Sequence, residues 1–176
     1  HGASGLSVLT DLNFFGGTPE DVHRARVNDI PILRKDFMID EYQITEAKAM
    51  GADVILLIAA CLSPQRVKEL ASFAKQTGLE VLLEIHTEEE LQHICDDTEL
   101  VGVNNRDLKT FTVDIQRSIE LSKKIPAGKI KIAESEKLIQ QKIASMKMKG
   151  SSSFQSVITI PIVVHVLYEN SSENIS

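Results

Sequence analysis

The chain has few aromatic residues and few cysteines. It has no tryptophan, aromatic residues make up only 5% of it, and its formal net charge is −6. Nucleic-acid interfaces need clustered basic and aromatic side chains, so this composition argues against a nucleic-acid partner. The cysteines, Cys61 and Cys95, lie in apolar or helical stretches without CxxC spacing. We therefore expect buried, reduced thiols and a reducing compartment, the cytoplasm.

Signatures of membranes, metals and nucleotides are also missing. No apolar stretch approaches the ~20 residues of a membrane span, and residues 1–4 lack the basic start and apolar core of a signal peptide. His86 and His93 are seven positions apart, His165 lies near the end, and no HExxH sequence occurs. We expect satisfied or exposed histidines and no metal. Because GxGxxG and GxxxxGK[ST] are absent, we expect no bound nucleotide.

Short, mostly unbroken apolar runs recur along the chain, as is typical of strands buried on both faces. The runs are Leu6–Leu9, Pro31–Leu33, Val54–Ile58, Val81–Leu83, Leu100–Val103 and Ile130–Ala133. Amphipathic stretches separate them, as where Val67, Leu70, Ala71 and Ala74 share one helical face.

Helix boundaries are marked between these runs. Capping oxygens precede prolines at Thr18-Pro19 and Ser63-Pro64, Thr87 with Glu90 predicts a capping box, and Gly51 and Gly78 are expected to end helices. Alternating strands and helices predict parallel strands with right-handed crossovers. Both a segment of a β/α barrel and an open doubly wound sheet fit this order.

Five of the runs end on a polar residue: Thr10, the Arg34-Lys35 pair, Glu84, Asn104 and Glu134. In a β/α barrel the carboxyl ends of the strands meet at the active-site mouth, so we expect these side chains to converge on one rim. A lysine, two glutamates and an asparagine provide a cation, proton donors and acceptors, and an orienting amide.

At this point the chain resembles the indole-3-glycerol-phosphate synthases of tryptophan biosynthesis. The resemblance is carried by Gly2–Gly17 (GASGLSVLTDLNFFGG), Pro31–Gln43 (PILRKDFMIDEYQ), Gly51–Ser63 (GADVILLIAACLS), Val81–His86 (VLLEIH), Val101–Phe111 (VGVNNRDLKTF) and Ile132–Ser135 (IAES). It implies an α/β fold, a (β/α)8 TIM barrel, and a carbon–carbon lyase without cofactor. The implied reaction is the decarboxylating ring closure of a small phosphorylated substrate, 1-(2-carboxyphenylamino)-1-deoxyribulose 5-phosphate, to indole-3-glycerol phosphate.

The resemblance also implies roles for individual residues. Lys35 would be the general acid at the substrate carbonyl, Glu84 would assist proton transfer in the later dehydration, and Asn104 would orient the intermediate, supported by Glu134. The implied substrate-binding residues are Phe15 and Phe37 at the aromatic ring, Arg106 near the anionic groups, and Ser135. The residues alone leave other interpretations open, with both phenylalanines in the core and Arg106 paired with Asp107.

The family pattern is incomplete in this sequence. Strands 2 to 7 of the barrel are recognisable, strands 1 and 8 are missing or replaced, and Glu136 stands where the family has a phosphate-binding glycine. We expect a partial barrel domain over residues 1–136, an atypical helix with a Ser-rich linker over 137–157, and a foreign-looking β-rich tail over 158–176. The tail resembles the opening strand of pappalysin-like metallopeptidases without their zinc motif.

This organisation predicts a truncated synthase joined to foreign sequence by a frameshift, gene fusion or assembly error. We expect weak or absent activity, and instability or self-association through two open sheet edges, one of which the tail strand is placed to cover. The alternatives are a non-catalytic remnant or interaction module, and another phosphate-binding barrel such as phosphoribosylanthranilate isomerase. The latter does not explain the RKDF and NNRDL sequences together.

Overall fold

The structure is a computed structural model that describes residues 5–13, 16–104, 115–134 and 163–164. Its strands are β1 (Leu6–Leu9), β2 (Ile32–Lys35), β3 (Val54–Ile58), β4 (Glu80–Ile85), β5 (Leu100–Asn104), β6 (Ile130–Glu134) and β7 (Val163–Val164). Its helices are α1 (Pro19–Ala25), α2 (Glu41–Met50), α3 (Pro64–Gln76) and α4 (Ile115–Lys124), with short 3-10 helices η1 (Ala59–Cys61) and η2 (Glu89–His93). Each of the six predicted runs forms a strand.

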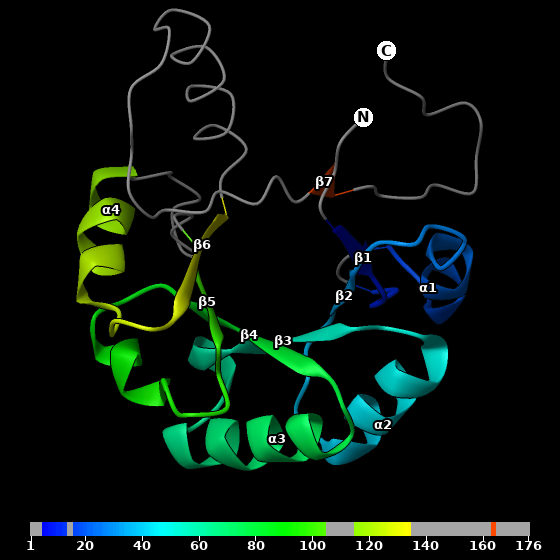
Figure 1. The fold of residues 1–176 in the computed structure, drawn as a ribbon, viewed down its shortest axis with the longest axis horizontal. Coiled ribbons are helices and arrows are strands. Elements are labelled where there is room, and N and C mark those ends of the chain that lie inside the picture. The colour runs from blue at the N-terminus through cyan, green and yellow to red at the C-terminus, as the bar shows by residue number, and fades with distance from the viewer. Residues whose placement is uncertain (1–4, 14–15, 105–114, 135–162, 165–176) are drawn as a thin grey trace, which may run out of the picture.

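The strands form one parallel sheet in the order β6-β5-β4-β3-β2-β1-β7. From β1 to β6 the order follows the sequence without reversal, and the helices lie along the outer, convex side of the curved sheet (Figure 1). A doubly wound sheet reverses its strand order and carries helices on both faces, so this arrangement is a segment of a β/α barrel. The short β7 lies beside β1, with Leu6 opposite Val163.

Two layers of apolar side chains cover the two faces of the sheet. The outer layer joins the strands to α2, α3 and α4 through fully buried residues such as Ile55, Leu57 and Leu83. The inner layer consists of Leu33, Leu56, Ile58, Leu82 and Ile132, with Phe37, Val54 and Leu100 packed against it. Residues two apart in a strand share a face, so this inner layer identifies which positions of each strand face the barrel interior.

The predicted helix boundaries are confirmed at α2 and α3. The Ser63 hydroxyl accepts a hydrogen bond from the Arg66 N–H at the start of α3, and Pro64 is its first residue. Gly51 ends α2 at a φ of 90°, a left-handed conformation that glycine adopts without steric cost. All four residues of the predicted apolar face of α3 are buried.

Two expectations were wrong. The capping box at Thr87 was expected to start a helix, but the connection from β4 to β5 contains only the short 3-10 helix η2. One bond of the expected box is present, because the Thr87 N–H donates to Glu90 Oε2 at 3.4 Å. Cys61 is exposed and Cys95 is half-buried, because Cys61 lies in the turn η1 beyond the end of β3 and not within the strand. Both cysteines are free thiols.

Candidate active site

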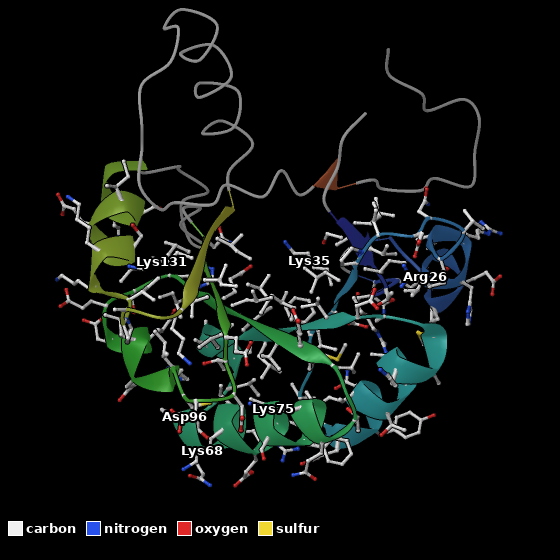
Figure 2. The ribbon with its side chains drawn as sticks, in the orientation of Figure 1. Arg26, Lys35, Lys68, Lys75, Asp96 and Lys131 are labelled. Atoms are coloured by element: carbon white, nitrogen blue, oxygen red, sulfur yellow. The ribbon has the colours of Figure 1, made fainter. Side chains whose placement is uncertain are left out.

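Three of the polar residues at the strand ends, Lys35, Glu84 and Asn104, share the inner face of the sheet. Lys35 follows Leu33 by two positions, Glu84 follows Leu82, and Asn104 follows Leu100 by four, so each continues the inner apolar row of its own strand. Figure 2 shows Lys35 on the concave side of the sheet and Lys68 on the outer side of α3. The barrel mouth therefore receives a cation, a carboxyl group and an amide from three strands.

Glu84 and Asn104 are in direct contact. The Asn104 side-chain amide donates a hydrogen bond of 3.2 Å to Glu84 Oε1. Glu84 is almost fully buried, at 4% relative exposure, whereas Lys35 and Asn104 are half-buried. The contact fixes one oxygen of a carboxyl group that is buried away from water, where electrostatic interactions are stronger than in water.

The backbone of β6 brings Glu134 to the same rim. Asn104 and Glu134 are partners in the β5–β6 register, and Glu134 follows the inner residue Ile132 by two positions. The Glu134 side chain is outside what the structure describes, so its role stays a prediction. Phe15, Arg106 and Ser135 also lie outside the described residues.

Thr10 does not join the rim, contrary to the prediction. It shares a face with Val8, which packs against α1, so its side chain lies on the outer side of the sheet. There its hydroxyl donates a 2.7 Å hydrogen bond to Asp36 Oδ2 and accepts one of 3.0 Å from Arg34 Nε. Thr10 contributes to the support of the site and not to its surface.

A buried charged cluster holds the segment that carries Lys35. The Arg34 side chain is 4% exposed and lies on the outer side of β2, where Nη2 donates to Asp36 Oδ2 at 2.9 Å and Nη1 pairs with Glu46 Oε2 at 2.8 Å. Nη1 also donates to the Gln43 carbonyl at 3.1 Å. We call Thr10, Arg34, Asp36 and Glu46 the Arg34 cluster. The Arg34 cluster includes the residues before and after Lys35, so it holds the end of β2 in place.

The same support extends into the loop after β2. Asp36 Oδ1 accepts a hydrogen bond from the Phe37 N–H at 2.8 Å, and the Gln43 amide donates to the Phe37 carbonyl at 2.9 Å. These bonds hold Phe37 against the inner apolar layer. Its placement there fits both the expected contact with an aromatic substrate and the alternative of a core side chain.

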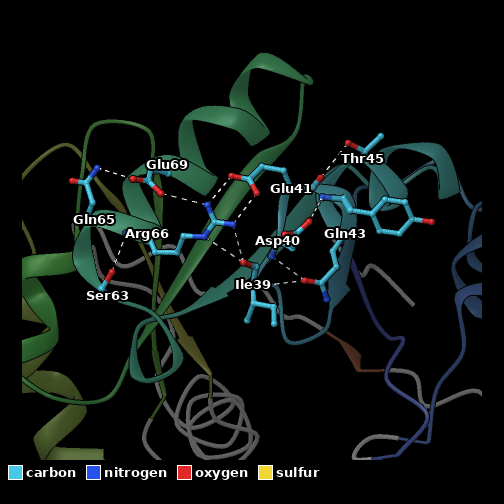
Figure 3. A network of polar contacts seen from close by, with 10 residues as sticks. Ile39, Asp40, Glu41, Gln43, Thr45, Ser63, Gln65, Arg66 and Glu69 are labelled. Atoms are coloured by element: carbon cyan, nitrogen blue, oxygen red, sulfur yellow. Dashed lines mark hydrogen bonds and ion pairs between the residues drawn. The ribbon is translucent and has the colours of Figure 1, made fainter.

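Arg66, from α3, binds the end of the loop between β2 and α2 (Figure 3). Its guanidinium forms a bidentate ion pair with Glu41, at 2.7 Å for each bond, and donates to the Ile39 carbonyl at 3.0 Å. Its hydrogen bond holds the pKa of Glu41 below the ordinary value of 4.5, and the pair raises the pKa of Arg66. The contact joins the starts of α2 and α3 beside the mouth.

Arg34 was expected on the rim together with Lys35, and this was wrong, because its side chain lies on the outer side of β2 and pairs with Asp36 and Glu46. Sequence reasoning missed this support by Asp36 and Glu46, because it depends on contacts between distant segments. The Glu90 carboxylate accepts the hydrogen bond from the Thr87 N–H that a capping box predicts, at 3.4 Å, and a second one from the His86 N–H at 2.6 Å that the sequence did not indicate. The signal for His86 was its position two residues after Glu84, which places both on one face.

The described residues contain neither a group of metal-ligating side chains nor a membrane-spanning helix. Within the described ranges, no three His, Cys, Asp or Glu side chains are grouped so as to hold a metal ion. Likewise, no helix in the described part of the chain has both the length and the apolar character needed to cross a membrane.

Comparison with known proteins gives one consistent family. The family model described as "Indole-3-glycerol phosphate synthase" matches residues 1–155. Curated proteins named indole-3-glycerol phosphate synthase include one from Bacteroides thetaiotaomicron, 50% identical over 135 residues, which are 76% of this chain and 52% of that protein. Another, from Dechloromonas aromatica, is 46% identical over 156 residues, 88% of this chain and 60% of that protein. The chain thus spans between half and two thirds of these relatives.

Solved structures agree with the barrel fold. A 3-keto-L-gulonate-6-phosphate decarboxylase from Vibrio cholerae has a TM-score of 0.56 at 16% identity, covering 75% of this chain and 67% of that one. A mutant tryptophan synthase alpha-subunit from Pyrococcus furiosus has a TM-score of 0.50 at 22% identity, covering 65% of this chain and 51% of that one. At these identities the likeness concerns the fold alone.

Proposed function

The chain belongs to the indole-3-glycerol phosphate synthase family, and from this premise we propose that its barrel mouth performs the decarboxylating ring closure of 1-(2-carboxyphenylamino)-1-deoxyribulose 5-phosphate. The product is indole-3-glycerol phosphate, an intermediate of tryptophan biosynthesis. The observation that carries the proposal is the convergence of Lys35, Glu84 and Asn104 on the inner face of three strands.

The first step joins the aromatic ring to the sugar chain. The ring carbon that bears the carboxylate attacks the ketone carbon, and the ketone oxygen takes a proton from the Lys35 ammonium group to become a hydroxyl. Carbon dioxide then leaves, and the electron pair of the broken bond restores the aromatic ring. A lysine held at the end of an apolar strand suits this role, because a fixed proton donor stabilises the charge that develops on the oxygen.

The second step removes water. The new hydroxyl leaves with a proton, while the neighbouring carbon loses one and the double bond of the indole forms. Glu84 carries a proton in this step, and Asn104, bonded to Glu84 Oε1 at 3.2 Å, orients both the carboxyl group and the intermediate. Carbon dioxide and water balance the reaction without a change that requires an electron acceptor, so we expect no redox cofactor.

The substrate is anionic at its carboxylate and phosphate groups. Lys35 provides positive charge at the described part of the mouth, and Arg106, Ser135 and Glu134 remain predicted contributors. The location of the reaction in the cytoplasm also stays a prediction, which rests on the two free thiols. Because the chain spans 52 to 60% of the relatives described above, the expectation of weak turnover by the chain alone is part of the proposal.

The test measures product fluorescence after the substrate is added to the purified chain. It is run on the chain alone and on the chain co-expressed with the segments of the Bacteroides relative that lie outside the match. We expect weak or no turnover alone and clear turnover after complementation. Lys35→Ala should lower complemented turnover by at least about a hundredfold, the scale of a lost general acid.

Lys68→Ala is the matched control, because Lys68 is an exposed lysine on the outer side of α3. It should leave turnover unchanged. Equal turnover in the Lys35→Ala and Lys68→Ala chains contradicts the assignment of Lys35. A complemented, folded chain that forms no product contradicts the proposed function as a whole.

A further inference from the structure

The His86 imidazole lies between two carboxylates. Its Nε2 is 3.4 Å from Glu84 Oε1, and its Nδ1 is 3.6 Å from Glu90 Oε2. The ring is 10% exposed, and among the described residues neither ring nitrogen has a hydrogen bond. Buried polar atoms are nearly always hydrogen-bonded, because an unbonded one destabilises the fold. The position of the His86 ring is therefore better explained by a function than by a contribution to stability.

Each carboxylate is held by a group other than the ring. Glu90 Oε2 accepts the His86 N–H at 2.6 Å, which fixes it to the backbone of the connection after β4. Glu84 Oε1 accepts the Asn104 amide at 3.2 Å, which fixes it to β5. The ring therefore faces one anchored carboxylate at the barrel mouth and a second one in the following connection.

His93, in the same connection, has different surroundings. Its ring nitrogens lie 3.1 Å from the Glu90 carbonyl and 2.9 Å from the Leu62 carbonyl, and the residue is buried. Carbonyl oxygens satisfy a histidine but do not exchange protons with it, whereas carboxylates do both. Only His86 of these two histidines is placed to transfer a proton.

The Cys61 thiol is a further titratable group that the charges of these carboxylates influence. Although Cys61 is exposed as a residue, partial desolvation of its thiol, and then the charges of Glu84 and Glu90, raise the pKa of the thiol. The thiol is therefore neutral near pH 7 and adds no charge beside the ring. Glu84 and Glu90 are the carboxylates that the described structure places within 3.6 Å of the His86 ring nitrogens.

We propose that His86 is a positioning residue that passes a proton between Glu84 and Glu90 and so resets the protonation of Glu84. The Glu84 carboxyl gives its proton to Nε2, and the proton on Nδ1 passes to the Glu90 carboxylate. One proton moves, the ring stays neutral, and the net charge of the three groups is unchanged. The buried Glu84 then exchanges protons without direct contact with bulk water. This role rests on the proposed function, in which Glu84 transfers a proton.

The distances of 3.4 and 3.6 Å exceed the usual hydrogen-bond range of about 2.7 to 3.2 Å. A shift of a few tenths of an ångström at each side of the ring closes the gap. Hydrogen bonds that serve catalysis are often long before the substrate binds and shorten in the complex.

The first test needs no turnover. Imidazole nitrogen NMR signals are measured on the full-length chain and on its Glu84→Gln and Glu90→Gln variants. Because each nitrogen faces one carboxylate, Glu84→Gln should change mainly the Nε2 signal of His86, and Glu90→Gln mainly its Nδ1 signal. The ring signals of His93 are the internal control and should stay in place. His86 signals that are the same in all three chains would overturn the proposal.

The second test uses the complemented turnover assay. His86→Gln keeps a polar side chain that can hydrogen-bond to both carboxylates but cannot pass a proton through a ring. We expect kcat to fall by about a hundredfold, the lower end of what a proton-transfer group contributes, with KM changed less than about twofold. A purely structural role predicts that glutamine preserves kcat, and that result contradicts the relay. If turnover does not depend on Lys35, the proposed function fails, while the NMR signals still decide whether the ring bridges the two carboxylates.

Discussion

Replacement of Arg34 by methionine should destabilise the chain more than any change to a surface ion pair. Methionine is similar in length and fills much of the same space, but it removes the partner of Asp36 and Glu46 and the donor to Thr10. Asp36 is then left as a buried charge, with its side chain only 10% exposed. Breaking a buried ion pair from one side costs about 3 to 5 kcal/mol. Since domains are typically stable by about 5 to 15 kcal/mol, the loss is a large fraction of the total.

The assay is urea unfolding of the full chain, monitored by circular dichroism, for four variants: Arg34→Met, Asp36→Asn, their combination, and Lys124→Met. Lys124→Met is the control, because Lys124 pairs with Glu88 while their side chains are 48% and 63% exposed. Such a pair contributes less than about 1 kcal/mol. Arg34→Met/Asp36→Asn should cost less than the sum of its two single changes, because no unpaired carboxylate remains. An Arg34→Met chain as stable as Lys124→Met contradicts the structural role of the Arg34 cluster.

Three further changes test other parts of the fold. Gly17→Ala should lower stability by roughly 1 to 3 kcal/mol in the same urea assay, because the added Cβ would lie 1.9 Å from the Leu9 carbonyl oxygen and force the loop to move. Leu83→Ala should cost about 2 to 5 kcal/mol, since this side chain is fully buried in the outer apolar layer. Glu41→Gln tests the ion pair with Arg66: because the folded pKa of Glu41 is lowered, its contribution is present above the ordinary value of 4.5 and is lost as the pH falls through the folded value. The stability difference between wild type and Glu41→Gln should therefore shrink in acid, and a difference that is constant from pH 7 to pH 3 contradicts the pairing.

The strands were predictable because each is buried on both faces. Such strands appear in the sequence as unbroken apolar runs and not as alternating polar and apolar residues. The bounds of β1 and β3 are those predicted. The runs of β2, β4, β5 and β6 each extend one or two residues further, to include the polar residue at the end. The sequence could not say which face each polar residue occupies, because this depends on how the sheet curves. Thr10 was misplaced for this reason, although it ends its run as Glu84 does.

The supporting contacts depend on the tertiary structure. Arg34 and Asp36 are adjacent to Lys35, but they are held by the carboxylate of Glu46 from α2, which pairs with Arg34, and by the hydroxyl of Thr10, which follows β1 and donates to Asp36. Glu90 matched a local capping pattern. Its proximity to the His86 ring could not be predicted, because it depends on the shape of the connection after β4. Local pattern therefore predicted where each strand ends, and contacts between distant segments decide which face each polar residue occupies and what holds it there.

The central claim is that Lys35, Glu84 and Asn104 line one reaction site on the inner face of the sheet. A crystal structure of the full chain with indole-3-glycerol phosphate bound tests it most directly. We expect the indole ring against Phe37 and a polar atom of the ligand within hydrogen-bond distance of Lys35 Nζ and of Glu84 or Asn104. Product bound on the outer, helix-covered side, or in the mouth without contact to Lys35, would contradict the account.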